Sequence, residues 1–131
     1  MKTIRVMIVD DSENWLAAVG RLLCQFPGVR IAGLASNGEQ ALGLAKHVDA
    51  DVVIMDPCMP GIGGHQAIRL LKSRRRPPAV VALTLLDSDA ARKAAFAAGA
   101  DQFLSKYEVA ADNASLFNAI RLTRPEFMAS A

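Results

Sequence analysis

Carboxylate side chains follow two apolar segments that have the composition of buried strands. Asp56 comes directly after the run at residues 52–55, and a loop rich in proline and glycine follows it. Asp10 and Asp11 come directly after a second apolar run, at residues 4–9. Parallel sheets bind ligands at the carboxyl ends of their strands, so this spacing places three carboxylates at one edge of a sheet.

Three ionised carboxylates in one cleft repel one another. Two unit charges about 4 Å apart cost roughly 4 kcal/mol at the effective dielectric of a protein surface. A bound cation or shifted pKa values must offset this repulsion. Ligands that are all oxygens favour a hard ion, Mg²⁺ or Mn²⁺, over Zn²⁺. Each aspartate alone is more often a strand-end turn or a helix cap, and the combination is what indicates a metal site.

Two further apolar runs end in side chains that complement the carboxylates. Thr84 follows residues 79–83, and Lys106 follows residues 102–105. Carboxylates that hold Mg²⁺, with an ammonium and a hydroxyl around one free aspartate oxygen, can take up and hold a phosphoryl group. The nucleophile in this chemistry is Asp56.

Five strand patterns alternate with five helical patterns, without an internal repeat or a long linker. The expected helices cover about residues 12–25, 38–47, 65–72, 88–98 and 111–122. With right-handed crossovers this alternation predicts an α/β fold, a flavodoxin-like (βα)5 three-layer sandwich with a parallel five-stranded sheet of order 2-1-3-4-5. The switch point of that sheet lies between its first and third strands, where Asp10, Asp11 and Asp56 meet.

Length and charge fit one domain with a buried core. A chain of 131 residues buries roughly two thirds of its unfolded surface. We expect residues 1–124 to form the domain and residues 125–131 to be a tail too short for an output domain. The net charge of +2 argues against direct nucleic-acid binding by this chain.

The sequence also predicts a cytoplasmic protein. It contains neither a targeting segment nor a run of 18 apolar residues, so we expect no membrane contact. Cys24 falls in a helical pattern, where we expect it to be in the core, and Cys58 lies in the loop after Asp56. Two cysteines placed in this way suit a reducing compartment.

The order of these residues resembles that of response-regulator receiver domains, the phosphoacceptor half of two-component signalling. The resemblance covers about residues 4–122. The matching residues at the strand ends are Val9-Asp10-Asp11, Met55-Asp56, Met59-Pro60-Gly61 with Gly64, Thr84 and Lys106. Residues 27–33 and 98–100 are most similar to receivers of regulators with helix-turn-helix output domains.

The resemblance implies the ligands of a magnesium ion beside the phosphorylation site. Asp56 is then the phosphorylated residue, and Asp11 and Asp56 bind Mg²⁺ directly. Asp10 binds a water molecule on the metal, and the backbone carbonyl of Cys58 completes the protein's share of the metal shell.

The resemblance also implies a switch. Lys106 pairs with Asp56 and later with the phosphoryl oxygens, while Thr84 moves to form a hydrogen bond with the phosphoryl group. Phe103 matches the aromatic residue that turns from exposed to buried in this family. The protein is then a phosphoacceptor that assists its own phosphorylation and dephosphorylation, and not an enzyme.

Partners follow from the same resemblance. The phosphoryl group comes from a sensor histidine kinase or a histidine phosphotransfer protein. A downstream protein or a second copy binds the face formed by the fourth helix, fifth strand and fifth helix. Trp15 stands four residues after Asp11, where receivers commonly meet their phosphodonor; a partly packed helix aromatic is the alternative interpretation.

Four residues depart from the family's pattern. Tyr107 replaces the usual proline, and we expect a trans bond before it because a cis bond there costs about 2.5–4 kcal/mol. Leu85 replaces a small residue and predicts partial shielding of Asp56. Pro57 lacks a backbone donor, and Gly63 stands where Asp or Asn is common. These changes affect the rate of phosphorylation and the lifetime of the phosphorylated state more than they affect the resemblance to the family.

Three other functions use the same features. A docking module that works without phosphorylation is the first alternative, because of these departures. An aspartyl-phosphate hydrolase would also use Asp56, but such enzymes have a second aspartate two residues later, where this chain has Cys58. A carrier of flavin mononucleotide would need phosphate donors after the first strand, where Asp10 and Asp11 would repel the phosphate. We therefore favour the phosphoacceptor switch.

Overall fold

The computed structural model describes residues 3–59 and 61–125, which form one five-stranded parallel sheet with six helices. The strands are β1 (Ile4–Val9), β2 (Val29–Ala35), β3 (Val52–Met55), β4 (Ala79–Thr84) and β5 (Gln102–Ser105). The helices are α1 (Glu13–Leu23), α2 (Gly38–Leu44), α3 (Gly64–Lys72), α4 (Asp89–Ala98), α5 (Lys106–Ala111) and α6 (Ala114–Thr123). The strand order β2-β1-β3-β4-β5 confirms the predicted flavodoxin-like fold.

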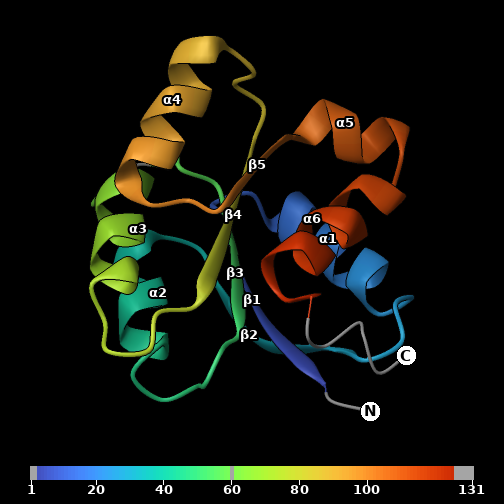
Figure 1. Ribbon diagram of the computed structural model, residues 1–131, viewed down its shortest axis with the longest axis horizontal. Coiled ribbons are helices and arrows are strands. Elements are labelled where there is room, and N and C mark those ends of the chain that lie inside the picture. The colour runs from blue at the N-terminus through green and yellow to red at the C-terminus, as the bar shows by residue number, and fades with distance from the viewer. Residues whose placement is uncertain (1–2, 60, 126–131) are drawn as a thin grey trace.

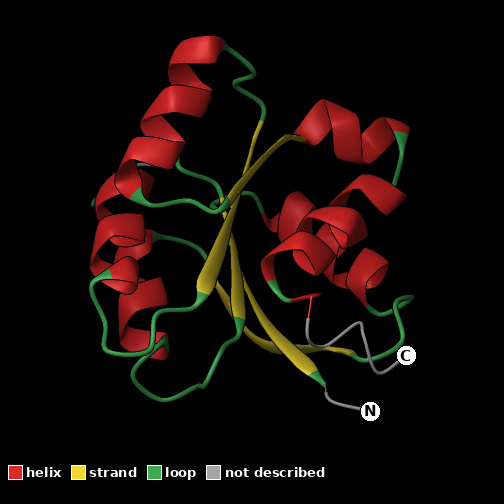
Figure 2. Ribbon diagram, in the orientation of Figure 1, coloured by secondary structure: helices red, strands yellow, loops and turns green. Residues whose placement is uncertain are grey.

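Helices cover both faces of the sheet and give three layers (Figure 1). Met7 and Val53 face α2, α3 and α4, whereas Ile8 and Ile54 face α1, α5 and α6. The twisted sheet lies between these two helical layers in Figure 2. Every residue of β3 and β4 is buried, as expected for strands in the middle of a parallel sheet.

The register of the strands aligns the ends that carry the predicted site. Val9 pairs with Met55 across β1 and β3, and Met55 pairs with Ala82 across β3 and β4. Asp10 and Asp56 are the residues that come next on β1 and β3. The sheet therefore brings the first and third strand ends together, at the point where the strand order reverses.

The predicted final helix, from about residue 111 to 122, corresponds to α6, which begins three residues later. The short helix α5 was not predicted, and it begins immediately at Lys106. A capping box stabilises its start: the amide of Glu108 donates to the Ser105 hydroxyl, and the Glu108 carboxylate accepts from the Ser105 amide. The break between the helices falls at Asp112, whose side chain accepts from the amide of Ala114 at 3.1 Å.

Two other expectations need correction. Helix α1 ends at Leu23, so Cys24 caps the helix and is exposed instead of lying in the core. Helix α2 ends at Leu44, three residues earlier than expected, and continues as a turn in which the amide of His47 donates to Leu44.

Most of the predicted tail, from residue 126 on, lies outside the described residues. Within the described ranges, no helix is long and apolar enough to cross a membrane.

Candidate functional site

The structure brings the three predicted carboxylates together at the ends of β1 and β3. Asp10, Asp11 and Asp56 each offer an oxygen, and these atoms lie within 4.8 Å of one another. Asp10 is 3% exposed and Asp56 is 7% exposed, while Asp11 is exposed. This oxygen-only donor set, with one member open to solvent, fits a hard divalent cation such as Mg²⁺.

Both oxygens of Asp56 have a partner. Its Oδ1 accepts a hydrogen bond from the amide of Cys58 at 2.8 Å, and its Oδ2 accepts one from Lys106 Nζ at 3.1 Å. The amide of Asp56 donates to the carbonyl of Val9 at 3.0 Å, which fixes the backbone against β1. Because Pro57 has no N–H, Cys58 supplies the first backbone donor after the aspartate. The side chain is therefore held in one orientation.

Lys106 is a buried cation in this cluster, with 3% exposure. Its Nζ lies 2.7 Å from Asp10 Oδ2 and 3.1 Å from Asp56 Oδ2. Burial by itself would lower the pKa of Lys106, but the hydrogen bond to Asp10 and the charge of Asp56 outweigh this and raise the pKa above 10.5. The ammonium is therefore fully charged at neutral pH. The pairing with Asp56 was expected from the sequence, whereas the shorter contact with Asp10 was not.

For Asp10, in contrast to Lys106, burial decides the direction of the pKa shift. Burial raises the pKa of Asp10 above 3.8 and outweighs the lowering effects of Lys106 and of the amide of Ser12, which donates to Oδ1 at 2.9 Å. The nearby charge of Asp56 raises it further. Asp10 is thus more easily protonated in the folded state than a free aspartate, and a bound cation would counteract this effect.

Gly64 matches the family pattern in the sequence, and its lack of a side chain lets the loop after Asp56 pack against the start of α3. A Cβ built on Gly64 would lie 2.7 Å from the carbonyl oxygen of Asp56 and still closer to the Cα of Pro57. Real Cβ atoms do not approach so closely, so the first residue of α3 can meet this loop only as glycine.

The predicted switch residues occupy defined positions. Thr84 is 1% exposed, and its hydroxyl accepts from the amide of Leu86 at 3.2 Å. Phe103 is 5% exposed and packs in the core layer that contains Ala95 and Ala98 of α4. The guanidinium of Arg92 lies 4.9 Å from the centroid of the Phe103 ring.

The expectation that Phe103 starts out exposed does not agree with this structure. The small side chains on the buried side of α4 leave room for the ring, and Arg92 covers it from outside. Sequence reasoning missed Arg92, since the pairing needs the spatial relation of α4 to β5.

The departures from the family pattern lie around the site. The described residues contain no cis peptide bond, so the bond before Tyr107 is trans, as expected. Leu85 is 50% exposed and Tyr107 is 66% exposed, and Cys58 is exposed as well. Gly63 is the N-cap of α3 and provides no side-chain cap.

Comparison with known proteins places this geometry in context. Residues 6–121 match the family described as the response regulator receiver domain. Response regulator GacA from Pseudomonas viridiflava is 37% identical over 119 residues, which make up 91% of this chain and 54% of that protein. The chain thus spans about half the length of this curated relative.

Solved structures agree with the sequence match. The response regulator domain of Thermotoga maritima CheB has a TM-score of 0.84 at 27% identity, covering 93% of this chain and 96% of that one. A two-component response regulator of the LuxR family from Aurantimonas sp. has a TM-score of 0.83 at 28% identity, with coverage of 94% and 88%.

Proposed function

The chain belongs to the response regulator receiver domain family, and from this premise we propose that Asp56 accepts a phosphoryl group from a phosphohistidine donor. The observation that carries the proposal is the environment of Asp56: a carboxylate at the switch point of the sheet, with Cys58 N–H on one oxygen and the Lys106 ammonium on the other. A fixed nucleophile beside a buried cation suits attack on a charged phosphorus centre.

The proposed transfer is a displacement at phosphorus. An oxygen of the Asp56 carboxylate forms a bond to phosphorus while the bond from phosphorus to the donor's imidazole nitrogen breaks. The imidazole takes the electron pair of that bond, and the proton on its other ring nitrogen makes it a neutral leaving group. Lys106 offers its charge to the phosphoryl oxygens, because its Nζ is already 3.1 Å from Asp56 Oδ2.

Mg²⁺ is the cofactor that the donor set favours. Asp11 and Asp56 would hold it directly and Asp10 through a bound water molecule, and the backbone carbonyl of Cys58 is the proposed third direct protein ligand. When bound, the ion supplies positive charge beside the transferred phosphoryl group. The ion would also favour the ionised form of Asp10, since a nearby cation offsets the cost of its burial.

We propose that the output is a change at the face of β5 and its neighbouring helices. Thr84 would exchange the amide of Leu86 for a phosphoryl oxygen, and the space around Phe103 would change with it. Leu85 and Leu86, in the loop after β4, and Tyr107, in the first turn of α5, are large exposed hydrophobic residues. A downstream protein or a second copy of the chain would bind there and would have to prefer one state to shift the equilibrium.

The partners would be a sensor histidine kinase or a histidine phosphotransfer protein on the donor side. The domain would act as the acceptor in this reaction and would not turn over a separate substrate. We place the reaction in the cytoplasm, where such donors present their phosphohistidine.

The test is phosphorylation by acetyl phosphate with Mg²⁺, followed by intact mass. We expect one phosphoryl group, lost in mild alkali and absent in Asp56→Asn, because an acyl phosphate hydrolyses readily. Asp11→Asn should remove most of the Mg²⁺ affinity, while Glu13→Gln, at the start of α1, should retain it. An alkali-stable adduct on Ser12 or Ser105 would overturn the mechanism, and no adduct at all would favour the docking module.

A further inference from the structure

The buried ammonium of Lys106 has a third neighbour besides its two carboxylates. Its Nζ lies 5.0 Å from the centroid of the Trp15 ring, within the distance at which a cation is attracted to an aromatic face. We propose that Trp15 is a positioning residue for Lys106. The indole of Trp15 holds the Lys106 ammonium between Asp10 and Asp56. This inference rests on the proposed function, because it assigns a role in phosphoryl uptake to a residue outside the acidic cluster.

The electrostatics of the ammonium explain why an aromatic face is useful. Lys106 is 3% exposed, and its ammonium has three N–H groups, so beside the contacts with the two carboxylates one N–H has little access to water. Indole is the strongest of the aromatic partners for a cation, and the attraction grows when the pair is shielded from water. A third carboxylate would add charge to a site that already contains three acids.

One turn of the chain fixes both Asp10 and Trp15. The amide of Ser12 donates to Asp10 Oδ1 at 2.9 Å, and the Ser12 hydroxyl accepts from the amide of Trp15 at 3.3 Å as the N-cap of α1. The acidic partner of Lys106 and its aromatic partner are therefore held by the same hydrogen-bonded turn. This connection fixes the backbone of Trp15 relative to the carboxylate of Asp10.

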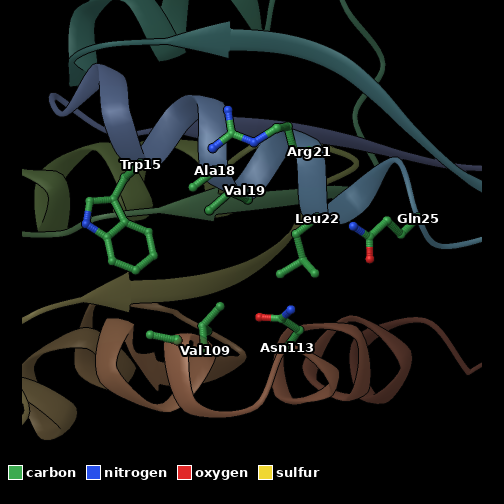
Figure 3. A pocket seen from close by; sticks show the side chains of 9 residues that line it. Trp15, Ala18, Val19, Arg21, Leu22, Gln25, Val109 and Asn113 are labelled. Atoms are coloured by element: carbon green, nitrogen blue, oxygen red, sulfur yellow. The ribbon is translucent and has the colours of Figure 1, made fainter.

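Trp15 lies between the core and an open hollow at the surface. Trp15 is half-buried and borders a hollow of about 280 Å³ between α1 and the segment that carries Val109 and Asn113. Figure 3 shows Trp15 at one end of this hollow, on the side of α1 that faces that segment. Trp15 also packs against the core layer that contains Val19 and Leu22, so packing accounts for part of its position. The contact with Lys106 is the one that requires an aromatic ring.

The ring also suits the change that phosphorylation would bring. Phosphorylation replaces the Asp56 carboxylate charge with the larger charge of a phosphoryl group, and the ammonium must then bind a phosphoryl oxygen. An aromatic face attracts the cation without a directional hydrogen bond, so Lys106 can shift while the attraction persists. Without the ring, the ammonium would be less well placed for the developing charge.

A spectroscopic measurement tests the geometry without any phosphoryl group. The ε-methylene protons of Lys106 should be shifted upfield by the ring current of Trp15 in the metal-free full chain. The shift should disappear in Trp15→Leu and remain in part in Trp15→Phe. Val19→Ala, which removes buried volume one turn further along α1, should leave it unchanged. Lys106 protons that do not move in Trp15→Leu would overturn the proposal.

A kinetic measurement tests the role. We expect Trp15→Leu to lower the rate of phosphorylation by acetyl phosphate about five- to thirty-fold, and Trp15→Phe to restore part of it. Trp15 is the only tryptophan in the sequence, so the whole protein can be labelled with fluorinated tryptophans that weaken the ring's attraction for cations with little change of shape. The rate should fall with each added fluorine, whereas Val19→Ala should lose stability and keep its rate.

The two measurements separate this inference from the proposed function. A rate that is unchanged across the fluorinated series would show that the ring acts only through packing, and would overturn the positioning role. If wild type takes up no phosphoryl group on Asp56, the proposed function fails, and the ring-current comparison still decides whether Trp15 holds Lys106 in place.

Discussion

The ammonium of Lys106 makes its shorter carboxylate contact with Asp10, at 2.7 Å. Its contact with the proposed phosphoacceptor is longer, at 3.1 Å. Lys106 would therefore keep one acidic partner while the other carboxylate is converted to an acyl phosphate. The arrangement has a cost in the metal-free protein, because Asp10 is a buried acid whose ionised form is disfavoured by burial.

Asp10→Asn should make the metal-free protein more stable at neutral pH. Because the folded pKa of Asp10 is raised above 3.8, the stability linked to its proton is fully present below pH 3.8 and is lost as pH rises through the folded pKa. Asparagine avoids this loss, so we expect the melting temperature to rise by about 2–5 °C in calorimetry.

The pH dependence provides the control for this variant. The difference between wild type and Asp10→Asn should shrink as the pH is lowered and Asp10 becomes protonated. Asp11 is an exposed carboxylate in the same cluster, so Asp11→Asn should change the melting temperature less. If Asp10→Asn is less stable at neutral pH, the ion pair with Lys106 outweighs the cost of burial.

Gly64→Ala should displace the loop that carries the phosphoacceptor. The added Cβ would lie 2.7 Å from the Asp56 carbonyl oxygen, so the loop or the start of α3 must move. We expect a loss of about 1–3 kcal/mol in the free energy of unfolding and at least tenfold slower phosphorylation. Urea unfolding and acetyl phosphate kinetics measure the two effects.

Gly43→Ala is the matched control for this change. Gly43 lies within α2, and a Cβ there would meet no atom within 4 Å. Alanine should stabilise the helix by about 0.5–1 kcal/mol and leave phosphorylation unchanged. Equal effects of the two substitutions would show that the loop contact at Gly64 is not specific.

Arg92→Gln should loosen the packing of Phe103 without preventing phosphorylation. The guanidinium lies 4.9 Å from the ring centroid and covers a residue that is 5% exposed. We expect a loss of about 0.5–1 kcal/mol in stability and altered NMR shifts of the Phe103 ring. Lys93→Gln removes an adjacent charge on α4 and should alter neither. Unchanged Phe103 shifts in Arg92→Gln would exclude this cation from the switch.

The sequence predicted the strands and the acidic cluster for one physical reason. The fully buried β3 and β4 read as continuous apolar runs, and parallel pairing aligns their ends whatever the loops do. Once the strand order is known, Asp10 and Asp56 must be neighbours. Local composition and one topological rule were sufficient for this part of the site.

Other features depend on side-chain placement that no local pattern contains. The contact of Lys106 with Asp10 and its distance from Trp15 arise where three segments meet, so spacing along the chain does not reveal them. The burial of Phe103 depends on how closely α4 approaches β5. By contrast, α5 had a local signal that was overlooked, the Ser105-x-x-Glu108 capping box.

Ser105→Ala should connect this capping box to the chemistry of the site. The Ser105 hydroxyl accepts from the amide of Glu108 at 3.0 Å, and the helix that it caps begins at Lys106. Loss of the cap should cost about 0.5–2 kcal/mol and slow phosphorylation several-fold, because the backbone that carries the ammonium becomes less fixed.

Ser88→Ala separates this effect from a general loss of a cap. The Ser88 hydroxyl accepts from the amide of Ala91 at 3.1 Å and caps α4, which carries none of the residues around Asp56. It should lose a similar free energy of unfolding and keep the phosphorylation rate of wild type. If both variants slow the reaction equally, the rate follows overall stability, and α5 has no special part in placing Lys106. If only Ser105→Ala slows it, the cap of α5 contributes to the position of the ammonium beside Asp56.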